Sequence, residues 1–471
     1  MDVKVKRGLN ELSATEIVAK IAAGEITCEA VTRDCIQRIA AREAIVKAWV
    51  NFNPELALAQ AHALDREPCR GPLHGVPIGV KDVIDTFDMP TEMGSPIYRG
   101  YRPTADAACV ALLRRAGAVI LGKTATCELA GTAPAATTNP HNAAHTPGGS
   151  SSGSAAAVAD FMAPAATTNP HNAAHTPGGS SSGSAAAVAD FMVSAALGTQ
   201  TGGSVLRPSS FCGVFGYKPT YNTFNKAGLK PAAESIDTIG WIARSIEDIA
   251  LLTAVLRVDE PQPLRSVSAP PRIGICRTEL WDSAQLETKS AVENAALALS
   301  KAGAIVCDVN LPGEFAGLHA LARGTINHYE RAACMAFEWD NHRVALSPQM
   351  RRYIESGIKT SRAEYVAAWR RVEQCRALLP EVFDGIDVLL APCVPGEAPK
   401  GLASTGDPSM QAMWTALHTP TMTLPTHRGP NNLPVGVQLV AQRYDDDRLF
   451  ACARWIWDRI GPPEMVGVNR L

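Results

Sequence analysis

Two hydrophobic periods alternate along this chain, and each predicts a different kind of element. Ser13 and Glu16 form a capping-box pattern, and the apolar residues after them recur at helical spacing. The runs 76–80 and 118–121 are short and largely apolar, which is typical of buried strands. A helical pattern over 105–116 separates the two runs. This alternation of strand and helix predicts an α/β fold in which helices cover a largely parallel sheet.

The same patterns predict further elements along the rest of the chain. Residues 316–379 have a helical pattern with several aromatic side chains, and no linker divides the sequence, so we predict a single domain over 1–471. Other helices are predicted after Thr27 and over 53–64, 288–302 and 446–458, and other strands over 195–199, 272–276, 388–392, 420–425 and 434–441.

One segment of the chain is present twice. Residues 133–162 recur letter for letter at 163–192. Repeat architectures need several diverged units, so two identical copies do not indicate a solenoid. Each copy contains the run Gly-Gly-Ser-Ser-Ser-Gly-Ser. The first serine of this run is Ser150 in the first copy and Ser180 in the second.

Composition excludes several classes of protein. The net charge is −2 with both signs mixed along the chain, so neither nucleic acid nor an anionic membrane is an expected partner. No run of apolar residues is long enough to cross a bilayer, and Met1–Leu9 has no apolar core of the kind that a signal peptide needs. The 12 cysteines contain no Cys-x-x-Cys pair, which favours a reducing, cytoplasmic environment.

Two serine-bearing, glycine-rich turns, 178–184 and 198–204, carry the candidate chemistry. Successive backbone N–H groups in such turns form a concavity for an anion, and a serine at its rim could attack a carbonyl group. A serine hydroxyl needs a base, and no histidine lies between Ser180 and Ser204. Lys81 ends an apolar strand, and serine–lysine pairs are a known variant of the catalytic triad. Burial would lower the pKa of Lys81 and leave it neutral.

Three other motifs are rejected on their context. Residues 117–124 match a phosphate-binding loop letter for letter, but their variable positions have a strand pattern. Residues 179–183 match the nucleophile elbow of α/β-hydrolases, but a loop rather than a strand precedes them. Two His-x-x-x-His pairs lie in proline-flanked segments where helix is disfavoured, so we predict no metal site at His141, His145, His171 and His175.

These residues resemble the amidase signature family of serine amidohydrolases. The resemblance covers 75–82, 176–189, 198–220 and 433–440, in the order that the family has them. It implies a single amidase domain, with a large mixed, mostly parallel central sheet covered by helices on both faces. It also implies that no cofactor or metal is required, and that 316–379 is the region in which members vary most.

The resemblance further implies a Ser–cis-Ser–Lys triad. Ser204 would be the nucleophile, Ser180 the bridging serine after a cis peptide bond, and Lys81 the base. Backbone N–H groups around the residues just before the nucleophile would form the oxyanion hole, namely Thr201, Gly202 and Gly203.

The duplication leaves two candidates for the bridging serine. Ser180 has the family's separation from the nucleophile, whereas Ser150 has the family's separation from the lysine, as a tandem insertion would produce. We predict that Ser180 occupies the site, because its helix runs directly into the strand of Ser204. Residues 133–162 would then extend a loop, which costs little free energy. The reverse arrangement, with 163–192 extruded, stays open, as does an inactive product.

Gln200 and Arg207 are the candidate substrate-binding residues. Their positions resemble the malonamidase-like branch of the family, in which the arginine can bind a substrate carboxylate. A structural role for Arg207 before Pro208 is an equal alternative. The region 316–379 could form an acyl pocket or lid, or serve packing alone, and its aromatic residues would also admit aryl amides, esters or carbamates.

The sequence therefore predicts a serine amidohydrolase that cleaves the C–N bond of a small-molecule amide through an acyl-enzyme on Ser204. A homodimer is compatible with this prediction. Two alternatives remain. One is the glutaminase-type subunit of a tRNA amidotransferase, which works only with partner subunits. The other is a binding protein whose triad the duplication has disrupted.

Overall fold

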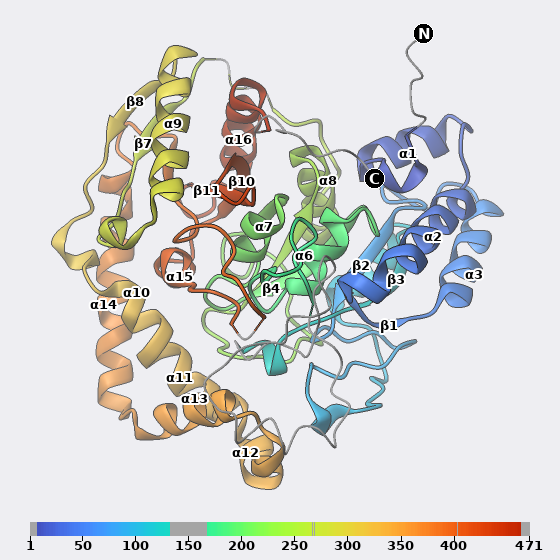
Figure 1. Ribbon diagram of the computed structural model, residues 1–471, viewed down its shortest axis with the longest axis horizontal. Helices are drawn as coiled ribbons and strands as arrows, with labels where there is room; N and C mark the ends of the chain where they lie inside the picture. The colour runs from blue at the N-terminus through green and yellow to red at the C-terminus, as the bar shows by residue number, and fades with distance from the viewer. Residues whose placement is uncertain (1–6, 132–166, 266, 268, 403, 463–471) are drawn as a thin grey trace.

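In the computed structural model, one sheet of eleven strands runs through the molecule (Figure 1). The structure describes residues 7–131, 167–265, 267, 269–402 and 404–462. In spatial order the strands are β1 (Trp49–Phe52), β3 (Val119–Thr124), β2 (Pro77–Lys81), β4 (Ala195–Gln200), β6 (Thr238–Ala243), β5 (Phe215–Lys218), β10 (Thr421–Arg428), β11 (Pro434–Val440), β9 (Val388–Pro392), β7 (Arg272–Ile275) and β8 (Ile305–Asp308).

Helices surround this sheet and extend beyond one end of it. In chain order they are α1 (Ala14–Ala22), α2 (Cys28–Val46), α3 (Pro54–Asp65), α4 (Ala108–Arg115), α6 (Ser182–Ala189), α7 (Leu206–Cys212), α8 (Ile246–Arg257), α9 (Leu286–Lys301), α10 (Leu318–Leu321), α11 (Asn327–Cys334), α12 (Ala336–His342), α13 (Pro348–Lys359), α14 (Arg362–Val382), α15 (Ser409–Ala416) and α16 (Asp446–Ile460).

The large mixed sheet and the α/β class are confirmed, but the expectation that the sheet is mostly parallel is wrong. Among the strand pairs of the described residues, only β3–β2, β2–β4, β9–β7 and β7–β8 are parallel. The central strands from β4 to β9 all pair antiparallel. The antiparallel pairing follows from the segments that connect these strands. A short turn joins β10 to β11, and a segment without a helix joins β5 to β6. A parallel pair needs a crossover connection, usually a helix.

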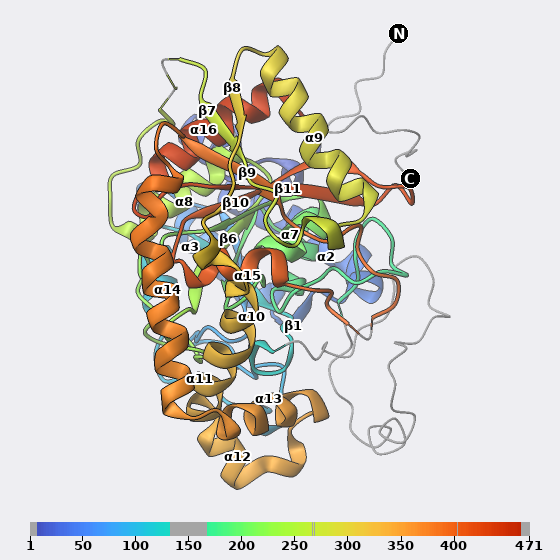
Figure 2. The same ribbon diagram turned by 90° about the vertical axis from the view of Figure 1, so that its left-hand side faces the viewer.

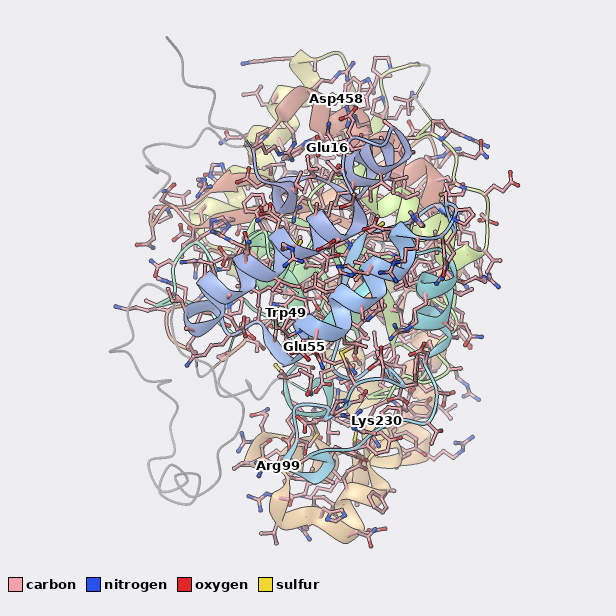
Figure 3. The ribbon with its side chains drawn as sticks, turned by 90° about the vertical axis from the view of Figure 1, so that its right-hand side faces the viewer. Glu16, Trp49, Glu55, Arg99, Lys230 and Asp458 are labelled. Atoms are coloured by element: carbon pink, nitrogen blue, oxygen red, sulfur yellow. The ribbon has the colours of Figure 1, made fainter. Side chains whose placement is uncertain are left out.

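Helices cover both faces of the sheet, as predicted, and the strand residues alternate accordingly. In β3, Ile120 packs into the core that contains α4 and α8, whereas Val119 and Leu121 pack into the core that contains α2, α3 and α6. Successive side chains of a strand point to opposite faces, so both cores are built on one strand. Figure 3 looks onto the α2 and α3 layer and labels Trp49 at the start of β1 and Glu55 in the first turn of α3.

The predicted helical region is confirmed as α10 to α14, which extend away from the sheet (Figure 2). A π-helical turn, Ala322–Ile326, joins α10 to α11. An ion pair of 2.5 Å between Lys230 and Glu338 ties α12 to the body of the molecule, and Lys230 is labelled in Figure 3. Within the described residues, no helix combines the length and the apolar character that crossing a membrane requires.

Candidate active site

The turn before α6 brings Ser180 into the interior of the molecule. Gly178 and Gly179 have φ angles of 78° and 58°, in the left-handed region that favours glycine. A Cβ atom on Gly179 would lie 2.6 Å from Cδ of Pro208, so the close approach of this turn to α7 also requires glycine. The result is a tight turn that ends at a buried serine.

Lys81 meets this turn from the neighbouring strand. It ends β2, which pairs in parallel with β4, so both strands present their carboxyl ends to the same edge. Its Nζ donates hydrogen bonds to Ser180 Oγ at 2.6 Å and to Thr199 Oγ1 at 2.7 Å. The Lys81 side chain is fully buried, and this desolvation lowers its pKa to about 7, against smaller opposing effects from Cys127 and Asp237.

Ser204 lies beside the same turn. Its carbonyl oxygen accepts a 3.2 Å hydrogen bond from the backbone N–H of Ser181, the residue after Ser180. Its hydroxyl group makes no hydrogen bond to a described residue. The structure therefore places Lys81 in contact with Ser180 and the Ser204 backbone beside the same turn, but no hydrogen bond among the described residues joins the Ser180 and Ser204 hydroxyl groups.

The segment just before Ser204 carries a row of free backbone donors. Within the described part of the chain, the N–H groups of Thr201, Gly202, Gly203 and Ser204 have no acceptor. The hydroxyl of Thr201 donates to Asp237 Oδ1 at 2.5 Å, which holds the segment in place. Unpaired, consecutive N–H groups are what an oxyanion hole requires.

Two predictions about the bridging serine have different outcomes. Ser150 and the whole first copy of the repeat lie outside the described residues, so Ser180 is the candidate that the structure shows beside Lys81. The predicted cis peptide bond before Ser180 is wrong, because the described residues contain no cis peptide bond. The positive φ angles of Gly178 and Gly179 provide the reversal of the chain instead.

Gln200 supports the site rather than lining it, which corrects its predicted contact with substrate. Its Oε1 accepts the backbone N–H groups of Val205 and Leu206, at 2.9 and 3.0 Å, where α7 begins. Its Nε2 donates to Thr415 Oγ1 at 3.0 Å, and Thr415 in turn donates to the carbonyl of Gly202 at 2.7 Å. Gln200 is fully buried. Its carboxamide hydrogen-bonds to the start of α7 and to Thr415 of α15, and so connects the loop of Ser204 to both helices.

A cavity of about 340 Å³ opens beside Ser204, and Arg207 lines it. The Arg207 side chain is 1% exposed, and its Nη2 donates to Thr405 Oγ1 at 3.2 Å. Its Nε and Nη1 have no partner among the described residues. Burial lowers the pKa of this guanidinium to about 10, so it still carries a positive charge at neutral pH. An unpartnered, buried charge of this kind favours an anionic ligand.

The opposite wall of the cavity was not predicted residue by residue. Its lining side chains from α10, the π-helical turn and α11 include a polar set that recurs at every fourth position: His319, Arg323, Asn327 and Arg331. Residues four apart lie on the same face of a helix. The spacing of these polar residues could therefore have been recognised in the sequence of the predicted helical region. Thr199, which accepts from Lys81, was also missed, although it lies in the same glycine-rich motif as Ser204.

The rejected motifs have other roles where the structure describes them. Val119–Thr124 is a strand, and Lys123 is buried in an ion pair with Asp82 at 3.4 Å, so the phosphate-loop match does not form a loop. His171 is hydrogen-bonded to the carbonyl of Cys212 at 2.6 Å. His141 and His145 lie outside the described residues. Among the described residues, no cluster of three potential metal ligands is found.

Comparison with known proteins gives consistent matches over most of the chain. The family model described as Amidase matches residues 30–168 and 165–450, two segments that meet close to the boundary between the repeat copies. The A subunit of glutamyl-tRNA(Gln) amidotransferase from Chloroflexus aurantiacus is 33% identical, over 94% of this chain and 95% of its own length. Its counterpart from Oleidesulfovibrio alaskensis is also 33% identical, over 95% of this chain and 97% of its own length.

The solved structures with similar folds include two that are described as amidases. A crystal structure of an amidase has a TM-score of 0.83 and 28% identity, and the match covers 96% of this chain and 100% of that one. The peptide amidase from Stenotrophomonas maltophilia has a TM-score of 0.75 and 28% identity, with 96% and 98% covered. The fold is thus shared with proteins described as amidases, and the sequence similarity to the family extends over most of the chain.

Proposed function

The chain belongs to the amidase family, and from that premise we propose that it is a serine amidohydrolase that cleaves the C–N bond of a small amide through an acyl-enzyme on Ser204. One observation carries this proposal. A buried lysine, Lys81, donates a 2.6 Å hydrogen bond to Ser180, beside a segment that ends at Ser204 and carries four backbone N–H groups without an acceptor among the described residues. Nucleophile, relay and oxyanion donors are the parts that acyl transfer needs.

The proposed reaction begins with proton transfer along the two serines. Neutral Lys81 accepts the proton of Ser180, and the Ser180 oxygen takes the proton of Ser204 as Ser204 attacks the amide carbonyl. The N–H groups of the 201–204 segment stabilise the oxyanion, and the loss of one such donor typically costs about 2.7–4 kcal/mol. Ser180 then protonates the departing amine, and water hydrolyses the acyl-enzyme by the reverse relay.

The proposed mechanism depends on a lysine that is neutral before turnover. A lysine in water has a pKa near 10.4 and is charged at neutral pH. Burial lowers the pKa of Lys81 to about 7, so a large fraction of the protein holds Lys81 as a base at physiological pH. Thr199 Oγ1 gives this amine a second fixed partner at 2.7 Å, which orients it toward Ser180.

We further propose that the substrate is a small amide with a carboxylate that Arg207 binds. The cavity of about 340 Å³ is near the lower end of the range for ligand pockets, which favours a small molecule. Nε and Nη1 of Arg207 have no partner among the described residues, so each could donate a charge-assisted hydrogen bond to a carboxylate. Esters and carbamates have the same attackable carbonyl and stay as further substrate classes for this chemistry.

Turnover of paired substrates tests this function. Malonamate should be hydrolysed with a higher kcat/KM than a neutral aryl amide such as acetanilide, and Ser204→Ala should abolish both activities. Hydrolysis of both amides without preference for the acid would contradict the role of Arg207 but keep the amidohydrolase. No turnover of amides, esters or carbamates by a folded protein would contradict the amidohydrolase itself.

A second candidate is the glutaminase-type subunit of a tRNA amidotransferase. The observation that favours it is the 33% identity to the A subunits of glutamyl-tRNA(Gln) amidotransferases over almost the whole chain. Such a protein would release ammonia from glutamine only when its partner subunits are present. Vigorous hydrolysis of malonamate by this chain alone would argue against the candidate, whereas glutamine hydrolysis that requires the other subunits of such an enzyme would favour it over the first proposal.

A further inference from the structure

The cavity beside Ser204 has a strongly cationic wall. Three arginines line it, Arg207, Arg323 and Arg331, and the described lining residues include no aspartate or glutamate. The three arginines differ in how their charge is balanced. Arg323 forms a 2.8 Å ion pair with Asp407, and its side chain is partly exposed. Arg207 and Arg331 form no ion pair within the described part of the chain and are buried.

Among the described residues, Arg331 is held in position by neutral groups. Its Nη1 donates to the carbonyl oxygen of Leu129 at 3.2 Å, and its Nε donates to Asn327 Oδ1 at 3.3 Å. Its Nη2 donates to no described residue. The side chain is 2% exposed, so its charge has lost most of its hydration without gaining a counter-ion. Such a charge is costly unless an anion is supplied.

The two carboxylates that act electrostatically on Arg331, Asp237 and Glu128, already have other partners. Asp237 accepts the hydroxyl of Thr201 and the backbone N–H groups of Ala232 and Ala233. Glu128 accepts the backbone N–H of Ser347. Both act on the Arg331 charge electrostatically, but neither forms an ion pair with it in the described part of the chain. The free nitrogen of Arg331 therefore remains available to a ligand in the cavity.

The local helix geometry directs Arg331 into the cavity. Arg323, Asn327 and Arg331 follow one another at intervals of four residues, and in a regular α-helix such a row rotates gradually around the axis. The π-helical turn Ala322–Ile326 is wider than an α-helical turn and offsets that rotation. Single π-helical turns occur frequently at functional sites. The row consequently keeps facing the Ser204 cavity from Arg323 to Arg331.

We propose that Arg331 forms a second anion-binding subsite in the Ser204 cavity, so that the preferred substrate is a small amide with two acidic groups. Arg207 on α7 takes one group, and Arg331 on α11 takes the other. This inference rests on the proposed amidohydrolase function for its chemistry, but the binding of a dianion to the cavity can be measured without turnover.

Calorimetric titration of the full-length Ser204→Ala protein tests the subsite. N-malonylglycine carries two carboxylates, and N-isobutylmalonamate has the same shape with one carboxylate replaced by an isopropyl group. 2-Carbamoylsuccinate, compared with 2-isobutylmalonamate, places the second carboxylate on the acyl side. We expect one of the dianions to bind about tenfold or more tightly than its matched monoanion. Equal binding within both pairs would overturn the proposal.

The variants assign the preference to one side chain. Adding Arg331→Met should bring the dianion-to-monoanion ratio close to one, whereas Arg352→Met, an exposed arginine on α13 that bonds to Gln349, should leave the ratio unchanged. If Arg331→Met does not fold, Arg331→Gln, which can still donate to Leu129, gives the same comparison. A dianion preference that survives loss of Arg331 would contradict the subsite. Failure of the proposed function appears separately, as absence of turnover in the protein that retains Ser204.

Discussion

Nζ of Lys81 donates a hydrogen bond of 2.6 Å to Oγ of Ser180, although the two residues are far apart in the sequence. The contact exists because parallel strands β2 and β4 end at the same edge of the sheet and the glycine turn before α6 reaches back over that edge. Burial lowers the pKa of the Lys81 amine, which makes it a base near neutral pH. In the proposed reaction, the Ser180 hydroxyl passes its proton to this amine. Together the two side chains form the proton path of the proposed reaction.

The pH dependence of kcat/KM should report Lys81. Protonated lysine cannot accept a proton, so activity should be low below the pKa of Lys81, rise with pH through about 7, and level off above it. His328 lines the same cavity, but burial lowers its pKa to about 4, so its titration falls outside this window. A rate that does not change between about pH 6 and pH 8 would be inconsistent with a lysine base of this pKa.

The two copies of the repeat provide a matched pair of serine variants. Ser180→Ala should lower kcat by about 10²–10⁴-fold, because it removes the proton relay between Lys81 and Ser204. Ser150→Ala, the same change at the corresponding position of the first copy, should leave kcat unaltered. Steady-state kinetics of both variants checks this. The reverse result would mean that the first copy provides the bridging serine in solution.

Replacement of Arg207 should separate acidic from neutral substrates. Arg207→Met removes a buried guanidinium with two nitrogens that have no partner among the described residues, and kcat/KM for malonamate should fall by about 100-fold. Activity on acetanilide should change far less, because that substrate carries no carboxylate. Parallel assays of both substrates give the comparison. An equal loss on both would identify Arg207 as a structural residue, which is the alternative that its position before Pro208 suggested.

Gln200 should affect stability more than substrate binding. Gln200→Leu would leave the backbone N–H groups of Val205 and Leu206 without their acceptor, and each unsatisfied buried group costs about 1–3 kcal/mol. The free energy of unfolding should therefore fall by roughly 2–6 kcal/mol, as measured by denaturant titration. An unchanged unfolding free energy together with a raised KM would restore the direct contact with substrate that the motif comparison had indicated.

Local patterns in the sequence singled out candidate site residues but did not predict how the central strands pair. A strand end singled out Lys81 and two glycine-rich turns singled out Ser180 and Ser204, whereas the separate role of each serine came from the resemblance to the amidase signature family. The antiparallel pairing of β5, β6, β10 and β11 depends on how strands separated along the chain meet, which periodicity does not encode. The same limit explains why α7 and α15 were not predicted, since both are short and buried on nearly all sides.

Side-chain roles within the site were predictable only in part. Gln200 and Arg207 were placed together as substrate-binding residues from one motif, but the structure separates them. Gln200 faces the backbone of α7, whereas Arg207, in the first turn of that helix, faces the cavity. Arg331 belongs to a helical region in which several polar residues share one face. The sequence alone does not show that this face lines the cavity of Ser204.

Labelling with a fluorophosphonate tests the central claim most directly, because this reagent reacts only with a serine that a nearby base activates and an oxyanion hole supports. Mass spectrometry of the labelled, folded protein should locate one adduct on Ser204, and Lys81→Ala or Ser180→Ala should slow its formation by about 100-fold or more. An adduct on another serine, or no adduct on the folded protein, would contradict the account.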